Sequence, residues 1–195
     1  MDRRSDAKDL PFRENKVTTT SKLEERIFIA GFGGQGVMVL GKILAWAGLR
    51  EKWVVSWLPS YGAEMRGGTA HCFVRLASGK ISSPTFVYPT VAFVFNQLSW
   101  DKFTPKVKKA KLVIVNSSLV KSRYFPSNVS LIPLNQLALE IGSLKLVNTV
   151  ALGFFLKKRK LLKLSTVESV LKNFFKERKI VEMNLRALQV GINYG

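Results

Sequence analysis

A glycine-rich loop carries the first residues that suggest chemistry. Gly31, Gly33 and Gly36 satisfy the pattern G-x-G-x-x-G directly after the apolar run 26–30 and before an apolar pattern with helical spacing. Glycines permit a tight turn and a close approach of the backbone. The helix start then offers free N–H groups and a positive dipole end to an anion. The loop therefore predicts a site for a phosphate or another anion between a strand and a helix.

Two familiar versions of such a site are disfavoured by the neighbouring residues. A dinucleotide site needs an acidic residue about 20 positions further on, at the end of the second strand, to bind the ribose hydroxyls. No acidic residue lies between Lys52 and Ala63, so NAD and FAD are not expected. The loop is also not a P-loop, because no Gly-Lys-Ser/Thr follows it. A simpler alternative stays open, in which the glycines only allow close packing of the strand against the helix.

Residues 59–68 form the densest group of polar side chains near a strand end. Tyr61, Glu64 and Arg66 bring a phenol, a carboxylate and a guanidinium together among glycines. Arg66 can clamp a phosphate or a carboxylate, or it can pair with Glu64 and hold the loop. Arg and Tyr are also enriched at interfaces, so a subunit contact is an alternative. The segment holds no pair of nucleophile and base, and no self-sufficient active site is expected there.

The chain has a single cysteine, Cys72, and a single histidine, His71. One cysteine cannot form an intrachain disulfide or hold an iron–sulfur cluster, which takes four Cys ligands, and one histidine disfavours a His-based metal site. Neighbouring strand positions point to opposite faces of a sheet, so a Cys–His catalytic pair is not expected. We therefore expect no catalytic residue and no metal site within this chain.

Strands and helices must alternate to position these residues. The run 26–30, the glycine loop, a helix over 37–49 and a strand over 54–58 that stops at Pro59 resemble the opening of a βαβ unit. The other expected strands lie at 69–76, 80–82, 91–95 and 112–115, the first two forming a hairpin around Ala77-Ser78-Gly79. The other expected helices lie at 97–110, where Pro105 interrupts the helix, and at 135–142, 147–162 and 165–190.

The last helical pattern contains its own start and stop signals. Ser165 and Glu168 form a capping-box pattern, and a break is expected near Lys179. The elements together predict an α/β protein: a single three-layer α/β/α domain with a mixed, largely parallel sheet and a helical C-terminal third. We expect this domain to span residues 23–195. Residues 1–22, which offer little to bury, are expected to form a flexible arm.

The charge balance of the 195 residues narrows the choice of partner. Lys and Arg number 31 against 13 Asp and Glu, a formal net charge of +18, and much of the excess lies in 102–123 and 157–179. This charge favours nucleic acid, a phosphorylated ligand or an acidic protein, unless it only forms a solvated lysine-rich surface. The basic runs lack interleaved aromatic residues, which disfavours nucleic acid.

Membrane and secretory classes are not expected. No apolar run approaches the roughly 20 residues of a membrane-spanning helix. The polar start of the sequence lacks the apolar stretch of a secretory signal. We therefore expect a cytoplasmic location and no membrane association.

Two motifs in order make the chain similar to a known family. Gly31–Val37 and Pro59–Ala70 resemble the gamma subunit of 2-oxoacid:ferredoxin oxidoreductases. The resemblance extends to Ser83-Pro84, Asn96-Gln97 and the motif Asn148–Gly153, and covers roughly residues 25–192. Within the family, the unbroken Glu64-Met65-Arg66-Gly67-Gly68-Thr69-Ala70 looks most like the 2-oxoglutarate or branched-chain 2-oxoacid types.

The resemblance implies a non-autonomous enzyme subunit. The complete enzyme oxidatively decarboxylates a 2-oxoacid, 2-oxoglutarate being favoured, joins the acyl group to coenzyme A (CoA) and passes electrons to ferredoxin. Thiamine diphosphate and iron–sulfur clusters lie in the alpha, beta and, where present, delta subunits. The gamma subunit assists assembly and the CoA side of the site, and holds no cofactor alone.

The resemblance also implies three groups of binding residues. They are the glycine loop, the polar segment after the second strand, and two amides after a buried strand. By number they are Gly31, Gly33, Gly34, Gln35 and Gly36; Tyr61, Glu64 and Arg66; and Asn96 and Gln97. Gln35 is expected to donate a hydrogen bond to a bound phosphate or to a neighbouring subunit. The alternative for all three groups is a subunit interface without ligand contact, and the alternative function is a stand-alone nucleotide- or CoA-binding module.

Overall fold

A computed structural model describes residues 23–60 and 69–195 of the chain, and the expected arm over 1–22 lies outside these residues. The strands are β1 (Glu24–Phe32), β2 (Val54–Ser60), β3 (Thr69–Ala77), β4 (Val91–Val94), β5 (Leu112–Asn116) and β6 (Val129–Ile132). The helices are α1 (Val37–Arg50), α2 (Gln97–Val107), α3 (Leu134–Ile141), α4 (Val147–Lys158), α5 (Leu164–Phe174) and α6 (Arg178–Asn193), with a short 3-10 helix η1 (Leu144–Leu146) before α4.

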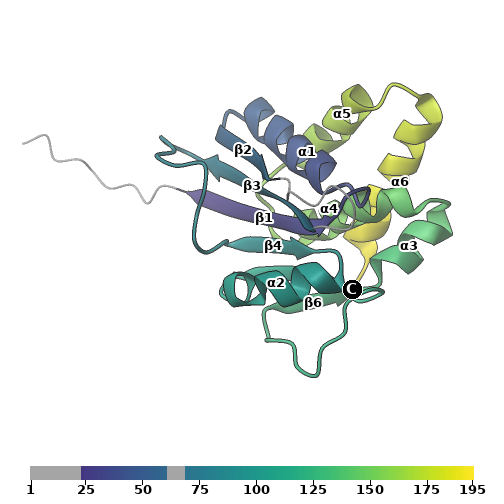
Figure 1. The fold of residues 1–195 in the computed structure, drawn as a ribbon. Coiled ribbons are helices and arrows are strands. Elements are labelled where there is room, and N and C mark those ends of the chain that lie inside the picture. Colours follow the sequence, from purple (N-terminus) through teal and green to yellow (C-terminus); the bar gives the residue numbers. More distant parts are fainter. Residues whose placement is uncertain (1–22, 61–68) are drawn as a thin grey trace, which may run out of the picture.

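The strands form one mixed sheet in the order β2-β3-β1-β4-β5-β6 (Figure 1). β1, β4, β5 and β6 are parallel to one another, whereas β3 runs antiparallel to both of its neighbours, β1 and β2. β2 is therefore parallel to β1, as in a βαβ unit, with β3 inserted between them. The expected mixed, largely parallel sheet is confirmed.

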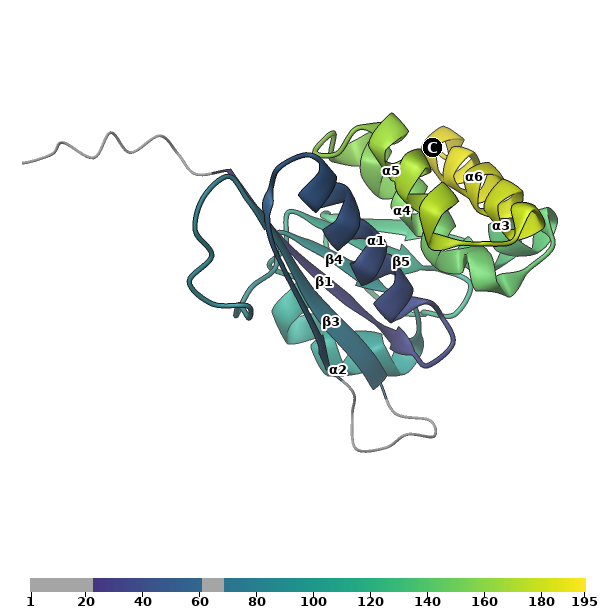
Figure 2. The ribbon, with the colours of Figure 1, turned by 90° about the horizontal axis from the view of Figure 1, so that it is seen from above.

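Alternating side chains of β1 separate two apolar cores. Ile27 and Ile29 point to the face covered by α1 and the C-terminal helices, whereas Phe28 and Ala30 point to the face covered by α2. The two figures show this arrangement, with α1, α4 and α5 on one side of the sheet and α2 on the other (Figures 1 and 2). The expected three-layer α/β/α architecture is confirmed, with most helices on one side.

The chain changes direction beside the glycine loop. The connection after β1 leads to α1 on one face, and the connection after β4 leads to α2 on the opposite face. The two connections therefore diverge beyond the carboxyl ends of these neighbouring strands. Such a reversal of strand order is where open α/β sheets bind ligands.

Helix α4 occupies the middle of the helical layer. Its residues from Val147 to Leu156 are all buried, so no polar face is needed. It crosses α6 at two glycines: a Cβ on Gly153 would lie 2.1 Å from Leu188 O, and one on Gly191 would lie 2.0 Å from Val150 O. Only glycine permits so close a crossing. None of the helices in the described part of the chain is long and apolar enough to span a membrane.

The second strand runs further than expected. β2 continues through Pro59 to Ser60, and Pro59 lies opposite Cys72 of β3. The expectation that Pro59 stops the strand was wrong because β2 is an edge strand, where a residue without an N–H is tolerated.

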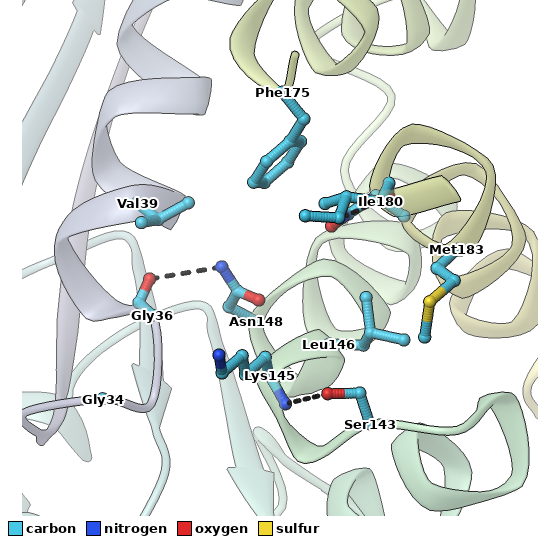
Figure 3. A pocket seen from close by; sticks show the side chains of 11 residues that line it. Gly34, Gly36, Val39, Ser143, Lys145, Leu146, Asn148, Phe175, Ile180 and Met183 are labelled. Carbon is cyan, nitrogen blue, oxygen red and sulfur yellow. Dashed lines mark hydrogen bonds between the residues drawn. The ribbon is translucent and has the colours of Figure 1, made fainter. Parts of the chain in front are cut away.

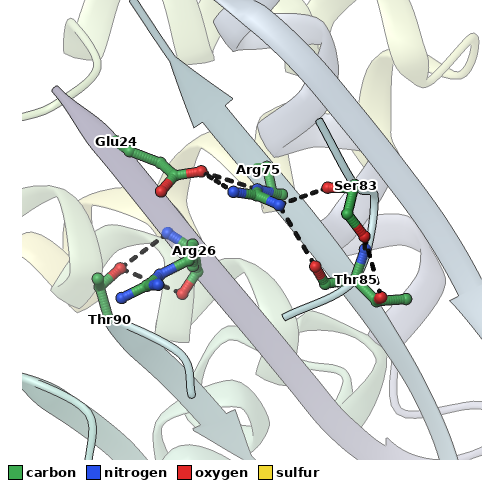
Figure 4. Close-up of polar contacts among 6 residues, drawn as sticks. All are labelled: Glu24, Arg26, Arg75, Ser83, Thr85 and Thr90. Carbon is green, nitrogen blue, oxygen red and sulfur yellow. Dashed lines mark hydrogen bonds and ion pairs between the residues drawn. The ribbon is translucent and has the colours of Figure 1, made fainter. Parts of the chain in front are cut away.

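The expected hairpin between 69–76 and 80–82 was also wrong. Both edges of β3 are already occupied by β1 and β2, so residues 80–82 have no strand to pair with. Side chains hold the segment that follows: the Arg75 guanidinium, which pairs with Glu24, also donates to Ser83 O, and Thr90 Oγ1 accepts from Arg26 N at 2.8 Å (Figure 4). The turn signal at Ala77-Ser78-Gly79 therefore marks the end of a strand rather than a hairpin.

The start of α5 differs from the expected capping box. Leu164 is its first residue and Lys163 its N-cap, without a side-chain cap, so Ser165 lies inside the first turn. Instead, Glu51, just beyond α1, accepts a hydrogen bond from the backbone N–H of Lys163 at 2.7 Å. The carboxylate of a residue distant in sequence therefore accepts a backbone hydrogen bond at this end of the helix.

The interruption expected at Pro105 was wrong, the break expected near Lys179 is confirmed, and one strand was missed. Helix α2 continues through Pro105 to Val107. Pro105 is exposed, so the backbone hydrogen bond that a proline cannot donate is missing on the solvent side of the helix. The break between α5 and α6 falls at 175–177, before Lys179, because Phe175 leaves the helix in an extended conformation and packs on the core. β6, at the other sheet edge, was not predicted.

Candidate functional site

The glycine loop gives α1 an unprotected N-terminus. Gly36 is its N-cap, in the left-handed conformation with φ 76°, and no side chain in the described part of the chain caps the helix. The first turn contains no acidic residue. The positive end of the helix is therefore open to an anion from outside the helix.

Gln35 joins the glycine loop to the ends of β1 and β4. Its Oε1 accepts hydrogen bonds from Phe32 N at 2.7 Å and from Asn96 Nδ2 at 2.8 Å, while its Nε2 donates to Phe95 O at 3.3 Å. A Cβ on Gly31 would lie 2.9 Å from Gln35 Oε1, so the glycine makes room for the amide. Gln35 thus holds the loop to the neighbouring strand, and its second amide hydrogen stays available for another acceptor.

The structure brings Asn96 to this point but not Gln97. Asn96 is buried and is the N-cap of α2, where its Oδ1 accepts from Ser99 N at 2.9 Å. Gln97 instead donates to Asp101 Oδ1 at 2.8 Å and accepts from Lys121 N at 2.8 Å. Gln35 and Asn96 therefore form one polar unit, and Gln97 fastens a separate loop.

Some of the remaining predicted residues belong to the glycine loop, and the others lie outside the described part of the chain. A Cβ on Gly33 or Gly34 would meet no atom of residues 23–60 and 69–195 within 4 Å, whereas one on Gly36 would lie 2.5 Å from Asn148 Nδ2. Gly33 and Gly34 therefore present free backbone. Tyr61, Glu64 and Arg66 lie outside the described residues.

Two hollows meet at the glycine loop. The first, about 320 Å³ in volume and here named the Phe175 pocket, is lined by Gly34, Gly36, Val39, Ser143, Lys145, Leu146, Asn148, Phe175, Ile180, Met183 and Asn184 (Figure 3). The second, about 310 Å³, is lined by Phe32, Gly33, Gly34, Gly36, Val37, Met38, Val39 and Ala70. Gly34 and Gly36 line both.

Sequence analysis missed the residues that complete the first hollow. Lys145 and Asn148 come from η1 and the start of α4, and Phe175, Ile180 and Met183 from the α5–α6 connection and α6. Asn148 Nδ2 donates to Gly36 O at 3.3 Å, which ties α4 to the loop. The motif Asn148–Gly153 was the available signal. For the three apolar residues no local pattern distinguishes a pocket wall from core.

Cys72 and His71 lie on opposite faces of the sheet, as expected. Cys72 is buried beneath α1, and this burial raises the pKa of its thiol to about 12. His71 packs on the other face against Phe28 and Phe103, and its pKa is lowered by burial and then by Lys106 and Lys102. Cys72 is therefore neither a nucleophile nor a fit ligand for an iron–sulfur cluster. The described residues contain no group of three potential metal ligands.

Comparison with known proteins places the chain in a family. The sequence profile of the pyruvate ferredoxin/flavodoxin oxidoreductases matches residues 26–194. Ketoisovalerate oxidoreductase subunit VorA of Methanothermobacter thermautotrophicus is 35% identical over 173 residues, 88% of this chain and 36% of VorA. The pyruvate/ketoisovalerate oxidoreductases common subunit gamma of Thermococcus kodakarensis is 32% identical over 172 residues, 84% of this chain and 92% of the relative.

A solved structure shares the fold. The 2-oxoglutarate:ferredoxin oxidoreductase from Magnetococcus marinus, with 2-oxoglutarate, coenzyme A and succinyl-CoA bound, matches with a TM-score of 0.77 and 27% identity, over 87% of this chain and 30% of that one. The chain thus spans about a third of the length of this protein and of VorA. The family profile nevertheless covers nearly all of the described residues, which confirms the resemblance seen in the sequence. The chain belongs to the pyruvate ferredoxin/flavodoxin oxidoreductase family.

Proposed function

We propose that the chain is the gamma-type subunit of a 2-oxoacid:ferredoxin oxidoreductase and binds CoA at its glycine loop. The observation that carries the proposal is the open backbone of Gly33 and Gly34 beside the uncapped N-terminus of α1. This arrangement suits the diphosphate of CoA, because backbone N–H groups and the helix dipole favour anions. The net charge of +18 adds a long-range attraction for a polyanionic ligand.

The catalytic groups come from other subunits in this proposal. The only thiol is buried and protonated, and the described residues offer no ligand set for a cluster. Thiamine diphosphate and the iron–sulfur clusters belong to the alpha, beta and, where present, delta subunits. Ferredoxin meets the assembled complex in the cytoplasm. The gamma-type chain contributes assembly contacts and the CoA side of the site, to which we assign Tyr61, Glu64 and Arg66 as further binding residues.

The substrate of the complex is a 2-oxoacid, for which we favour 2-oxoglutarate. The motif Glu64–Ala70 supports the 2-oxoglutarate or branched-chain types. Relatives carry both kinds of name: VorA is a ketoisovalerate oxidoreductase subunit, and the Magnetococcus enzyme acts on 2-oxoglutarate.

An anaerobic affinity purification tests the proposal. The tagged chain is purified from its native cells, its partners are identified and quantified by mass spectrometry, and the eluate is assayed with 2-oxoglutarate, 2-ketoisovalerate and pyruvate. We expect thiamine- and iron–sulfur-binding subunits in equal amounts, and reduction of a viologen dye that depends on CoA. A chain recovered alone, or a complex whose activity does not require CoA, would contradict the proposal.

A stand-alone CoA- or nucleotide-binding module is the second candidate, favoured by the two hollows at the loop. It requires that the isolated chain binds CoA measurably in a calorimetric titration. It also requires that Gly33→Leu abolishes that binding; an added Cβ at this position meets no atom of the described residues within 4 Å. Binding by the isolated chain without any co-purifying subunit would favour this candidate over the first.

A further inference from the structure

The helical layer on the α2 side of the sheet is incomplete. Helix α2 packs over β1 and β4, whereas β2 and β3 lie on the other side of β1 from β4 (Figure 1). Residues 78–90, which connect β3 to β4, contain no helix. None of the described helices packs over β2 on this side, although α/β sheets of this kind are covered by helices on both faces.

The surface that β2 and β3 present on this side, here named the β2–β3 face, has an apolar centre. Leu58 of β2 lies opposite Phe73 of β3 in the strand pairing, so their side chains share this face. Leu58 is 36% exposed, and Val54, on the same face of β2, is 43% exposed. Phe86 borders the face, with its ring centroid 5.1 Å from that of Phe73. Adjoining apolar side chains that remain exposed favour contact with another protein.

A row of lysines follows the flank of α2 beside the β2–β3 face. Lys102 donates a hydrogen bond to Thr69 Oγ1 of β3 at 3.3 Å. Lys106 Nζ lies 4.7 Å from the centroid of the Phe73 ring, also on β3. Lys109 comes three residues later and continues the row. The apolar face therefore has positive charge along one side.

The charges of this lysine row are not neutralised within the described part of the chain. The ion pairs there all involve arginines. Glu24, at the start of β1, is the partner of Arg75, and Asp101 of α2 accepts from Gln97 at 2.8 Å. Residues 78–90 contain no acidic residue. The lysine row is thus open to carboxylates from another protein.

Resting on the proposed function, we propose that the β2–β3 face binds a helix of a partner subunit that is apolar toward Leu58 and acidic toward α2. Two neighbouring strands present a surface about 10 Å wide, which matches the diameter of one α-helix. Carboxylates of the partner helix complement the lysine row, and its apolar side removes Leu58 from water. The bound helix completes the helical layer that α2 begins.

A competition between tagged and untagged chains tests the apolar centre. Tagged wild-type chain and tagged variants are produced in native cells that hold the untagged chain in excess, and mass spectrometry quantifies the partner subunits recovered per tagged chain. We expect Leu58→Asp to lower this recovery at least about tenfold, because a charge replaces a central apolar contact. Leu131→Asp is the control, since Leu131 is 43% exposed on β6 at the opposite edge of the sheet, and it should match the wild type.

Charge reversal in the same competition tests the lysine row. The double variant Lys102→Glu/Lys109→Glu should lower the recovery of partner subunits about tenfold, as expected when two exposed charge pairs become repulsive. The control Lys160→Glu/Lys172→Glu makes the same change of charge at two exposed lysines on the α5 side of the sheet, and it should match the wild type. Because Lys102 and Lys109 are exposed, this pair of variants keeps the test valid if Leu58→Asp does not fold.

Carbodiimide cross-linking of the wild-type complex identifies the occupant of the face. The reagent joins a lysine amine to a carboxylate in contact with it, so at least one lysine of the row should be linked to an Asp or Glu of a partner subunit. Links confined to residues 1–22 or to a second copy of the chain would overturn the proposal, as would the absence of links to a partner. Equal recovery of partners by each variant and its control would also overturn it. A tagged wild-type chain recovered without any partner would instead contradict the proposed function.

Discussion

The side-chain amides of Gln35 and Asn96 meet across the carboxyl ends of two parallel strands, with Gln35 Oε1 accepting from Asn96 Nδ2 at 2.8 Å. Gln35 belongs to the glycine loop after β1, and Asn96 caps α2 after β4. One hydrogen bond thus joins the starts of two helices that pack on opposite faces of the sheet. It fixes the loop at the position where the strand order reverses and where ligands bind in such folds.

Removing this link should loosen the loop. Gln35→Ala leaves Phe32 N and Asn96 Nδ2 without their acceptor, so we expect the free energy of unfolding to fall by about 1–3 kcal/mol. Gln136→Ala is the control, because Gln136 is exposed and bonded only to Glu140 within its own helix, and it should cost less than about 0.5 kcal/mol. Urea denaturation of the isolated chain checks both. Equal losses of unfolding free energy in the two variants would show that the hydrogen bonds of Gln35 add no more stability than those of an exposed glutamine.

Substitutions at two glycines of the loop should affect stability and CoA binding separately. Gly36→Ala places a Cβ 2.5 Å from Asn148 Nδ2 at a φ of 76°, and should destabilise the chain by about 1–3 kcal/mol. Gly33→Ala meets no atom within 4 Å and should leave the melting temperature unchanged. If Gly33 contacts CoA, the same change raises the KM for CoA of the assembled complex. An unchanged KM would place the ligand away from Gly33.

Local sequence patterns predicted the elements that are buried along their whole length. β4 and β5 are continuous apolar runs, and the glycine loop between an apolar strand and a periodic helix could be assigned without tertiary information. β2 through Pro59 could not, because its tolerance of proline depends on lying at the sheet edge. The short β6, with Leu131 exposed, carries no such apolar run.

The candidate site was predictable in composition but not in geometry. Gln35 and Asn96 were both identified, yet 61 residues separate them and no local pattern indicates their contact. Phe175, Ile180 and Met183 read as ordinary core residues of the last helices. They become a pocket wall only because α6 packs against α4 at Gly153 and Gly191, a contact that depends on tertiary packing.

The ion pair between the buried Glu25 and the partly exposed Arg159 should stabilise the chain more than a surface pair does. Glu25 is 4% exposed, and both of its oxygens accept from Arg159 Nη2. Arg159→Ala leaves this carboxylate unpaired and should cost about 1–3 kcal/mol of unfolding free energy, because Arg159 itself is partly exposed. Arg178→Ala removes the exposed pair with Glu182 and should leave the unfolding free energy nearly unchanged, because solvent screens that pair. Denaturant titrations of the two variants measure both losses of unfolding free energy. Similar losses would contradict the prediction.

His71 should give the chain an acid-sensitive stability. Burial, and then Lys106 and Lys102, lower the pKa of His71 below its usual value of 6.5. The native state then binds fewer protons than the unfolded chain, so stability is full above pH 6.5 and falls as the pH is lowered toward the folded pKa. His71→Gln should flatten the unfolding free energy between pH 7 and pH 5, where no other imidazole titrates. A slope that survives the substitution would assign it to another group.

Cys72 should be inert in the native chain and cause a loss of stability at high pH. Its thiol pKa is raised from 9.0 to about 12 by burial, so at pH 8 almost no thiolate is present to react with iodoacetamide. The unfolded chain releases this proton at a lower pH than the native state does, so stability falls as the pH rises above 9. Alkylation followed by mass spectrometry should label Cys72 only in denaturant. Labelling of the native chain at the rate seen in denaturant would mean that α1 opens readily from the sheet, and the glycine loop at its N-terminus would then not be preorganised.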